Sequence, residues 1–202
     1  DLNEGYAIYR PRYILPDYNV YIKKGCEFLE LPAPKNLDEA LDGLLILYSH
    51  VPSITTFPVY IGRLDVLLDP FITDEEQDYI KIKRFLNHVD KTVPDSFCHA
   101  NIGPYDTKAG RLILKAVMEL EAPTPNMTIR YDKSKTSREF AELAAKACLL
   151  VSKPSFANDA YYISDLGEQY GIASCYNALP ECGGAYTLTR LRLGTIARAC
   201  KT

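Results

Sequence analysis

Apolar residues follow two different spacings along the chain. In some stretches an apolar residue recurs every three or four positions, which is typical of an amphipathic helix; in others a few apolar residues stand together, which is typical of a buried strand. The helical spacing covers residues 37–48, 82–89, 109–120 and 140–151. The short apolar runs predict strands at residues 58–64, 96–102, 126–131, 171–174 and 187–193, with a last helix from about Thr195.

Polar residues and prolines mark where these helices begin and end. Three segments have the spacing of a capping box, in which an N-cap side chain and an acid three residues later satisfy free backbone N–H groups: Asn36-Leu-Asp-Glu39, Thr73-Asp-Glu-Glu76 and Thr136-Ser-Arg-Glu139. We expect Asp106 to cap the helix over 109–120. Pro52 should end the first helix, and residues 154–167 should form a loop.

The alternation of helices and strands predicts an α/β fold with parallel strands, because helical crossovers of this length join parallel neighbours. Residues 36–202 form this domain, without an internal repeat or an obvious linker. Residues 1–35 are rich in Tyr and Pro and show no sustained period. We therefore expect an extended N-terminal arm that packs on a neighbouring surface, with one short helix near residues 18–28.

Charge and composition exclude several classes of protein. The net charge is -3, so the chain lacks the basic excess that nucleic-acid binding requires. No apolar run approaches the roughly 20 residues of a membrane-spanning helix, and the polar start Asp1-Leu-Asn-Glu4 has no signal-peptide pattern. The six cysteines are scattered without a Cys-x-x-Cys pair, which favours a reduced, cytoplasmic setting.

The segment Gly171-Ile-Ala-Ser-Cys-Tyr-Asn-Ala-Leu-Pro180 carries the main candidate for chemistry, Cys175. Its pattern predicts a short buried strand, a tight loop that presents one thiol, and a return through Gly183-Gly184. Between residues 171 and 189 there is no Lys, Arg or His, and Glu181 is the only acidic neighbour. A thiolate needs cations, a helix N-terminus or a metal nearby. Cys175 should therefore keep its proton and exchange hydrogen atoms instead of acting as an ionic nucleophile.

This segment, together with Thr187-Leu-Thr-Arg-Leu-Arg-Leu193, resembles the cysteine loop of glycyl radical enzymes, and of their YjjI-type branch in particular. Three further segments resemble that branch in the same order: Arg12-Tyr-Ile-Leu-Pro-Asp17, His50 to Gly62, and Ser96-Phe-Cys-His-Ala-Asn-Ile-Gly-Pro104. The likeness covers nearly the whole chain. Because four segments agree in order, it is more specific than the cysteine loop alone.

The resemblance implies half of a parallel α/β barrel around a central cysteine loop. It also implies that Cys175 carries a thiyl radical, which abstracts a hydrogen atom from a small organic substrate. A radical-SAM activating enzyme would install the initial glycyl radical. The family's glycine motif, similar to Arg-Val-Ser-Gly-Tyr, does not occur here, so the glycine is expected in the rest of a longer enzyme or in a separate glycine-bearing subunit. Assembly into a homo-oligomer is left open.

Two positions depart from better-known members of the family. Pyruvate formate-lyase-like enzymes carry adjacent cysteines, whereas Tyr176 follows Cys175 here. Dehydratase-like members carry an acid two residues after the cysteine, whereas this chain has Asn177, which cannot accept a proton at neutral pH. Neither of those two mechanisms is therefore carried over, and the substrate is left open.

Substrate binding is expected to involve His99 and Asn101, which share one face of their strand, together with Cys98, Tyr176 and Asn177. Polar groups on an inner strand face often orient a substrate. An equally good interpretation is that His99 and Asn101 form hydrogen bonds with the local backbone. Three less specific candidates are the pair Asn158-Asp159, which a loop turn explains, and Arg190 and Arg192, which a solvated strand face explains.

Three alternatives to radical chemistry stay open at this point. A metal could bind Cys98, His99, Cys175 and Cys182, although no pair has zinc-finger spacing. A cysteine hydrolase would need a histidine close to Cys175 in space. The chain could also be a non-catalytic piece in which Cys175 is simply a buried cysteine. We expect no bound metal and no resident cofactor in the chain itself.

Overall fold

The structure is a computed structural model that describes residues 18–55, 59–92, 98–168, 170–173 and 177–180. Its main sheet has four strands: β1 (Val59–Arg63), β2 (Cys98–Ile102), β3 (Asn126–Tyr131) and β4 (Ser155–Asn158). A separate hairpin contains β5 (Tyr170–Ala173) and β6 (Asn177–Pro180). The helices are α1 (Tyr18–Lys24), α2 (Leu37–Thr55), α3 (Leu64–Leu68), α4 (Glu75–Thr92), α5 (Lys108–Glu119), α6 (Arg138–Val151) and α7 (Asp159–Leu166), with 3-10 turns at Glu27–Leu29 and Asp69–Phe71.

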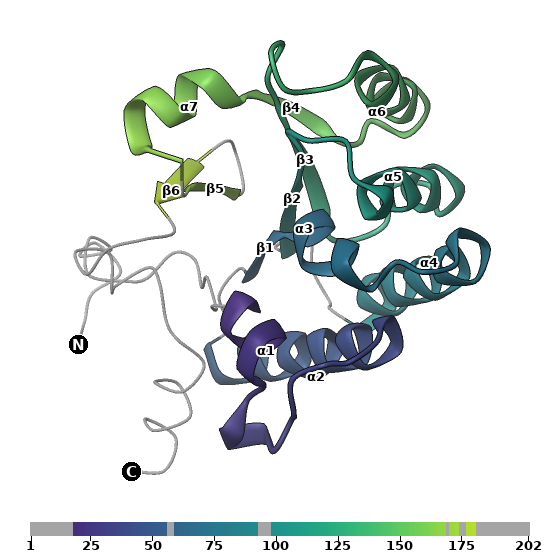
Figure 1. Ribbon diagram of the computed structural model, residues 1–202, viewed down its shortest axis with the longest axis vertical. Coiled ribbons are helices and arrows are strands. Elements are labelled where there is room, and N and C mark those ends of the chain that lie inside the picture. The colour runs from purple at the N-terminus through teal and green to yellow at the C-terminus, as the bar shows by residue number, and fades with distance from the viewer. Residues whose placement is uncertain (1–17, 56–58, 93–97, 169, 174–176, 181–202) are drawn as a thin grey trace.

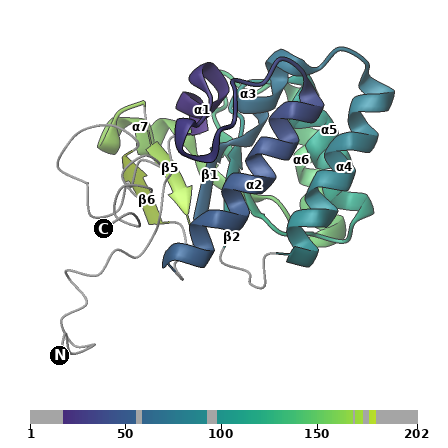
Figure 2. The ribbon, with the colours of Figure 1, turned by 90° about the horizontal axis from the view of Figure 1, so that it is seen from below.

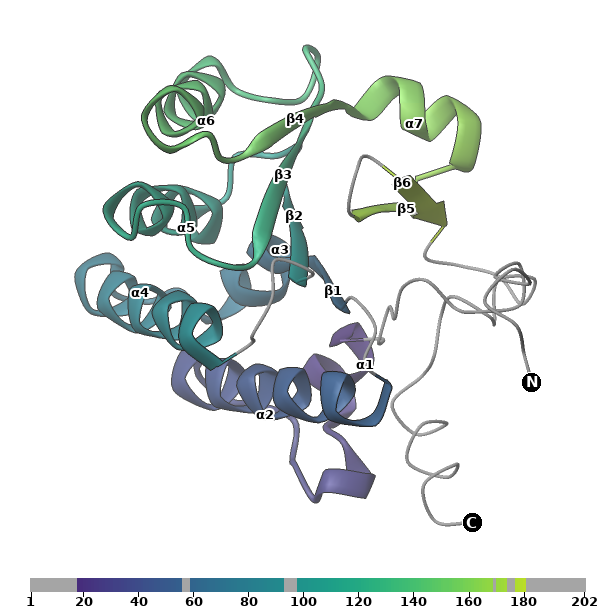
Figure 3. The ribbon, with the colours of Figure 1, turned by 180° about the vertical axis from the view of Figure 1, so that it is seen from behind.

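Figure 1 shows β1 to β4 side by side in chain order, and every neighbouring pair is parallel. Right-handed crossovers that always advance in one direction place their helices on one face of a sheet. α4, α5 and α6 accordingly lie in a row along one face, as the view from behind also shows (Figure 3). The β5-β6 hairpin lies on the opposite face, beside β2 and β1 (Figures 1 and 2). We call these two sides the helix face and the hairpin face.

The hydrophobic core lies between the helix face of the sheet and the helices. Side chains alternate between the two faces of a strand. In β2, Cys98, Ala100 and Ile102 belong to the core cluster, whereas His99 and Asn101 do not. All five residues are buried, so the hairpin face is covered as well. Coverage on both faces explains why this strand reads as an apolar run in the sequence.

The parallel α/β arrangement predicted from the sequence is therefore confirmed. The strands at 58–64, 96–102 and 126–131 occur as β1, β2 and β3, and helices follow the four apolar stripes. Within the described residues the sheet is open, since β1 and β4 each pair on one side only. The half-barrel stays a prediction.

Residues 154–167 are not the loop that we expected. They form strand β4 and helix α7. β4 has only four residues, Ser155–Asn158, and of these only Ala157 is buried. Such a short segment, with two polar and two apolar residues, has no periodic signal, and its strand geometry comes from parallel pairing with β3. This miss concerns the site directly, because Asp159 begins α7.

The helix predicted over residues 37–48, which is α2, begins where expected and ends later. Asn36 accepts a hydrogen bond from the backbone N–H of Glu39 (2.9 Å), which confirms it as the N-cap. The carboxylate of Glu39 accepts from the side-chain amide of Asn36 (3.0 Å) and from the backbone N–H of Lys35 (2.8 Å). α2 then continues through Pro52 to Thr55, so the expected end at Pro52 is wrong. Pro52 lies in the last turn, where its missing N–H removes a single bond to the preceding turn.

Asp106 does not cap α5. Thr107 is the N-cap, and its hydroxyl accepts a hydrogen bond from the N–H of Gly110 (3.0 Å). Asp106 instead accepts hydrogen bonds from the guanidinium of Arg111 (2.6 Å) and the hydroxyl of Ser137 (2.6 Å). The carboxylate thereby joins the beginnings of α5 and α6, a role that depends on two helices lying side by side.

At the other two predicted capping boxes the N-cap residue is displaced by one position. In α4 the carboxylate of Asp74, and not the side chain of Thr73, accepts from the first turn, and Asp78 accepts from the N–H of Asp74 (2.9 Å). In α6 the N-cap is Ser137 and not Thr136. In both segments two good N-cap residues are adjacent, so the sequence predicts a helix start without deciding which residue caps it.

The structure does not confirm an extended arm over the described residues 18–35. Tyr18 and Tyr21 in α1 are buried in the main core. The hydroxyl of Tyr21 lies so close to Gly43 of α2 that a Cβ at that glycine would be 1.6 Å from it. The short helix expected near residues 18–28 is confirmed as α1, although it is too short to show a helical period.

Several predictions fall on residues that the structure does not describe. These are the first part of the arm (1–17), the Gly183-Gly184 return, the strand at 187–193 with Arg190 and Arg192, and the last helix. Among the helices of the described segments, none is both long enough and apolar enough to cross a bilayer.

Candidate functional site

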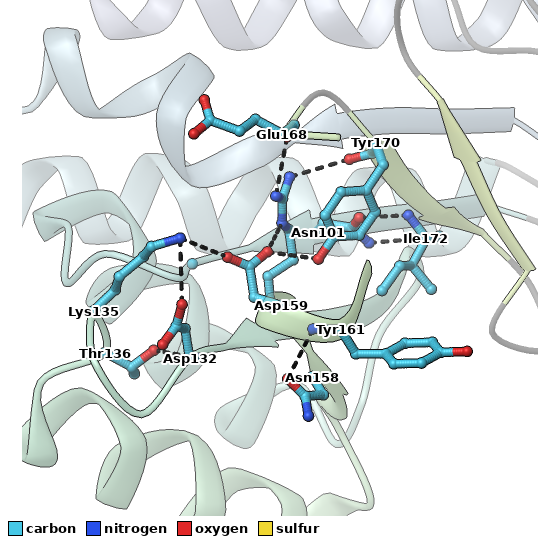
Figure 4. Close-up of polar contacts among 12 residues, drawn as sticks. Asn101, Asp132, Lys135, Thr136, Asn158, Asp159, Tyr161, Glu168, Tyr170 and Ile172 are labelled. Carbon is cyan, nitrogen blue, oxygen red and sulfur yellow. Dashed lines mark hydrogen bonds and ion pairs between the residues drawn. The ribbon is translucent and has the colours of Figure 1, made fainter. Parts of the chain in front are cut away.

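Asn101 on β2 holds the first strand of the hairpin against the sheet. Its side-chain amide donates to the carbonyl of Ile172 (2.8 Å) and accepts from the N–H of Ile172 (2.8 Å), as Figure 4 shows. Both residues are buried. One side chain thus satisfies both backbone groups of a residue in β5, in the way that a neighbouring strand would.

Tyr60 on β1 completes this contact. Its hydroxyl donates to the same amide oxygen of Asn101 (2.9 Å). Its ring lies against Gly171, where an added Cβ would be 2.5 Å from the ring. A side chain at position 171 would therefore push β5 away from the sheet, and glycine is required here for close approach.

Arg130 on β3 holds the chain just before and at the start of β5. Its guanidinium donates to the carboxylate of Asp159 (2.7 Å), the carbonyl of Tyr170 (3.1 Å) and the carbonyl of Glu168 (3.3 Å). The guanidinium also lies over the ring of Tyr170, 3.9 Å from the ring centre. The side chain of Arg130 is 3% exposed, so these bonds form away from water.

Asp159 is the acceptor at the centre of this network (Figure 4). Besides Arg130, it accepts from the hydroxyl of Tyr170 (2.6 Å) and lies 3.5 Å from the ammonium of Lys135. Lys135 also pairs with Asp132 (3.3 Å). Burial and the hydrogen bond to Asp159 raise the pKa of Tyr170, so its phenol stays protonated and continues to donate. A buried charge pair of this kind is kept only when hydrogen bonds satisfy it, as they do here.

The start of α7 explains how Asp159 reaches the network. Asn158 at the end of β4 is the N-cap, and its side chain accepts from the N–H of Tyr161 (3.3 Å). From the sequence, Asn158-Asp159 was a less specific site candidate that a loop turn also explained. The pair instead begins a helix, and Asp159 is fully buried beside the hairpin.

His99 shares the hairpin face with Asn101 and lies opposite Tyr60 in the register of β1 and β2. The side chain is 8% exposed, and its Nε2 atom is buried without a hydrogen-bond partner. Burial lowers the pKa of His99 to about 4. The imidazole is therefore neutral at physiological pH, and one ring nitrogen can still bind a polar group.

Cys98 lies on the other side of the sheet. It is part of the core under the helices, and burial raises the pKa of its thiol to about 12. Cys98 was predicted from the sequence to be one of the substrate-binding residues. This position separates its sulfur from the hairpin by the thickness of the sheet, so its contacts are those of a core residue.

Cys175 and Tyr176 lie outside the described residues, and of Asn177 only the backbone is described. The strands on either side are described. Ala173 pairs with Asn177 in an antiparallel register, so three residues close the hairpin and Cys175 is the middle one. The predicted strand before Cys175 is confirmed as β5, whereas the predicted turn residues and the Gly183-Gly184 return lie outside the described residues.

A second buried carboxylate, Asp65, joins the carboxyl ends of β1 and β2. Its Oδ2 atom accepts from the N–H of Gly103 (2.9 Å) and the hydroxyl of Thr107 (3.3 Å), whereas its Oδ1 atom is buried without a partner. Burial raises the pKa of Asp65 to about 6, although the hydrogen bond from Gly103 and the charge of Arg63 oppose the shift.

Tyr60, Arg130 and Tyr170 were not among the candidate residues that the sequence suggested, and Asp159 was only a less specific candidate. Arg130 directly follows the apolar residue Ile129 in the predicted strand, and successive side chains of a strand point to opposite faces. This alternation could have indicated that Arg130 faces away from the core. Nothing in the sequence said that its partner would be Asp159, because the two residues meet only in the folded chain. Within the described segments no group of three His, Cys, Asp or Glu side chains could hold a metal ion.

Comparison with known proteins agrees with the resemblance in the sequence. The chain matches the family described as glycyl radical enzyme YjjI-like over residues 1–202. It is 93% identical over 202 residues to an uncharacterized protein of Haemophilus influenzae strain Rd, covering 100% of this chain and 39% of that protein. It is 48% identical over 200 residues to the uncharacterized protein YjjI of Escherichia coli K12, covering 98% of this chain and 39% of YjjI.

The chain thus spans about two fifths of the length of these two relatives, each of which it covers to 39%. The match extends over every segment that carried the resemblance, from Arg12 to Leu193. The chain belongs to the YjjI-like glycyl radical enzyme family.

Proposed function

We propose that this chain forms the cysteine-loop part of a glycyl radical enzyme, with Cys175 as the thiyl site. In the first step the S–H bond of Cys175 breaks, and its hydrogen atom forms a C–H bond at the glycyl radical. The unpaired electron is then on sulfur. The thiyl radical takes a hydrogen atom from a C–H bond of a small organic substrate, which restores the thiol and leaves the unpaired electron on the substrate carbon.

The hydrogen bonds between Asn101 and Ile172 carry this proposal. A hydrogen atom moves only between groups in close contact, so the cysteine must be held in place. Asn101 fixes the backbone of β5 three residues before Cys175. The chain can extend at most about 7 Å from the Cα atom of Ala173 to that of Cys175. Cys175 is therefore tethered to a buried anchor on the hairpin face.

The charge around the hairpin favours a protonated thiol. No Lys, Arg or His occurs between residues 171 and 189. Arg130, which contacts the start of β5, is paired with the carboxylate of Asp159. A thiol with its hydrogen atom in place is what radical transfer needs, whereas a nucleophilic cysteine would need a nearby cation.

His99 is the described residue that we assign to substrate binding. Its free Nε2 atom lies on the face that also carries Asn101, and the imidazole is neutral. It suits an uncharged hydroxyl, carbonyl or amide group of a substrate. Asn101 has a different role in this proposal, because its amide is already occupied by Ile172 and Tyr60. Tyr176 and Asn177 stay proposed substrate contacts from the loop itself.

The proposal needs two partners. The radical-bearing glycine would lie in the part of the longer protein that residues 1–202 do not include, or in a separate subunit. A radical-SAM activating enzyme would install the radical. A site that holds a thiyl radical must also exclude water and other reactants, which agrees with the burial of Tyr170 and Ile172 at the base of the hairpin.

Hydrogen exchange of the glycyl radical tests the proposal without knowledge of the substrate. The full-length protein is activated and its radical is followed by electron paramagnetic resonance (EPR) in H₂O and in D₂O. If Cys175 exchanges hydrogen atoms with the glycine, its S–H becomes S–D in D₂O and deuterium moves to the glycine. The doublet from the α-hydrogen should then collapse.

The decisive variant is Cys175→Ala, which should form the glycyl radical but keep the doublet in D₂O. Cys148→Ala, which changes a partly exposed cysteine on α6, serves as the control and should exchange like the wild type. Exchange at the wild-type rate in Cys175→Ala would refute the proposal. The absence of any glycyl radical in the activated wild-type protein would do the same.

A further inference from the structure

The hairpin and the main sheet are joined by side chains and not by a backbone ladder. β5 pairs only with β6, and the two form a sheet of their own among the described residues. The polar contacts that fix β5 on the hairpin face come from Asn101 and Arg130. The position of the hairpin relative to the sheet therefore depends on a small number of side-chain bonds.

Arg130 binds three groups on two neighbouring segments of the chain, the start of α7 and the entry to β5. From β3 its guanidinium reaches Asp159 at the start of α7 and the carbonyls of Glu168 and Tyr170, at the entry to β5. Because β3 is an inner strand, paired with β2 and β4, the backbone that carries Arg130 is itself well held. The planar guanidinium has donors in fixed directions, so it both attracts its three acceptors and fixes their positions relative to β3.

The ring of Tyr170 adds a second constraint. It lies under the guanidinium at 3.9 Å, and its hydroxyl donates to Asp159. Arg130, Asp159 and Tyr170 therefore form a closed triangle in which each member contacts the other two. Such a closed arrangement resists sliding of β5 along the sheet more than a single hydrogen bond would.

We infer that Arg130 is a positioning residue for radical transfer at Cys175. The inference rests on the proposed function. Arg130 does not touch the sulfur; it fixes where β5 begins, five residues before Cys175, and Asn101 fixes β5 at Ile172. With the start of β5 released, the hairpin could tilt about the contact at Ile172. A shift of about 1 Å at a reacting group can cost on the order of 100-fold in rate.

The test compares Arg130→Gln and Arg130→Lys in the activated full-length protein. Lysine keeps the charge opposite Asp159 but cannot bind the three acceptors as a fork. We expect both variants to form glycyl radical in normal yield and to exchange its hydrogen with D₂O at least about 10-fold more slowly than the wild type, with glutamine slower than lysine. The peptide over residues 170–180 should also lose protection in amide hydrogen exchange.

The control is Arg138→Lys, which changes an arginine on α6 whose side chain is 87% exposed. It should exchange at the wild-type rate. Normal exchange in both Arg130 variants would overturn the inference while leaving the thiyl role of Cys175 intact. Normal exchange in Cys175→Ala would refute the proposed function itself. If Arg130→Lys failed to fold, Arg130 would be a residue of general stability and the inference would also be wrong.

Discussion

At the scale of single residues, buried polar side chains on the hairpin face bind backbone groups of β5 that a neighbouring strand would otherwise bind. Asn101 is fully buried and uses its amide as both donor and acceptor toward Ile172. A buried amide without partners would cost free energy, so this residue stabilises the fold only while the hairpin is docked. The side-chain amide of Asn101 therefore forms its hydrogen bonds to Ile172 only when the hairpin is docked on the sheet.

Replacing Asn101 with Leu should release the base of the hairpin. The change removes the bonds to Ile172 and Tyr60 and leaves buried backbone groups unpaired, at about 1–3 kcal/mol for each group. We expect amide exchange over residues 170–180 to become at least about 10-fold faster in the full-length protein, while α5 and α6 keep their protection. Tyr60→Phe, which removes one of the three bonds, should have a smaller effect. Unchanged exchange in Asn101→Leu would contradict this role.

At the scale of elements, the connections after β1 and β2 are tied together by Asp65. The carboxylate accepts from Gly103 after β2 and from Thr107, the N-cap of α5. Its other oxygen is buried without a partner, and burial raises its pKa to about 6. The charged form of Asp65 is thus less favourable in the folded protein than in the unfolded chain.

Asp65 should make stability depend on pH with a defined sign. The folded state holds a proton that the unfolded chain has lost between about pH 4 and pH 6, so stability falls as the pH rises through this interval. We expect the free energy of unfolding of the wild type, minus that of Asp65→Asn, to fall by up to about 3 kcal/mol between pH 4 and pH 6 and to level off above.

Urea unfolding of the wild type and of Asp65→Asn over pH 4–8 measures this difference. Subtraction removes the contributions of groups that titrate alike in both proteins, including His99, whose lowered pKa acts in the opposite direction. A difference that rises with pH, or that does not change, would show that Asp65 is not the group responsible.

At the scale of the whole molecule, the described residues form a parallel sheet with a layer of helices on one face and the β5-β6 hairpin, beside α7, on the other (Figure 1). The buried polar network lies on the hairpin face, away from the helices. Since the two relatives are longer and this chain covers 39% of each, the proposed radical chemistry belongs to the whole protein and not to residues 1–202 alone.

The 202-residue chain by itself should therefore form no glycyl radical. We expect the full-length protein to show an EPR doublet after incubation with its activating enzyme, and the chain of residues 1–202 to show none, because it lacks the proposed glycine. Adding the remaining part of the protein as a separate polypeptide should restore the signal if the two parts associate. A doublet from residues 1–202 alone would place the radical on a glycine of this chain.

The local pattern of the sequence determined most of the elements. Long apolar stripes such as 109–120 predicted helices, and compact apolar runs such as 126–131 predicted strands, because these spacings follow from the geometry of the backbone itself. The tight hairpin around Cys175 was also readable, since glycine and small residues precede it. Where two signals stood side by side, as at Asp106 and Thr107, the sequence located the helix start but not the capping residue.

Only the tertiary structure decided which polar residues meet. β4 is too short to carry a period of its own and exists because β3 pairs with it. Arg130, Asp159 and Tyr170 are separated by up to 40 residues in the chain, and their contacts exist only after three βα crossovers and α7 have been formed. Hydrogen bonds and charges act over a few ångströms in space, whereas a sequence records only neighbours along the chain.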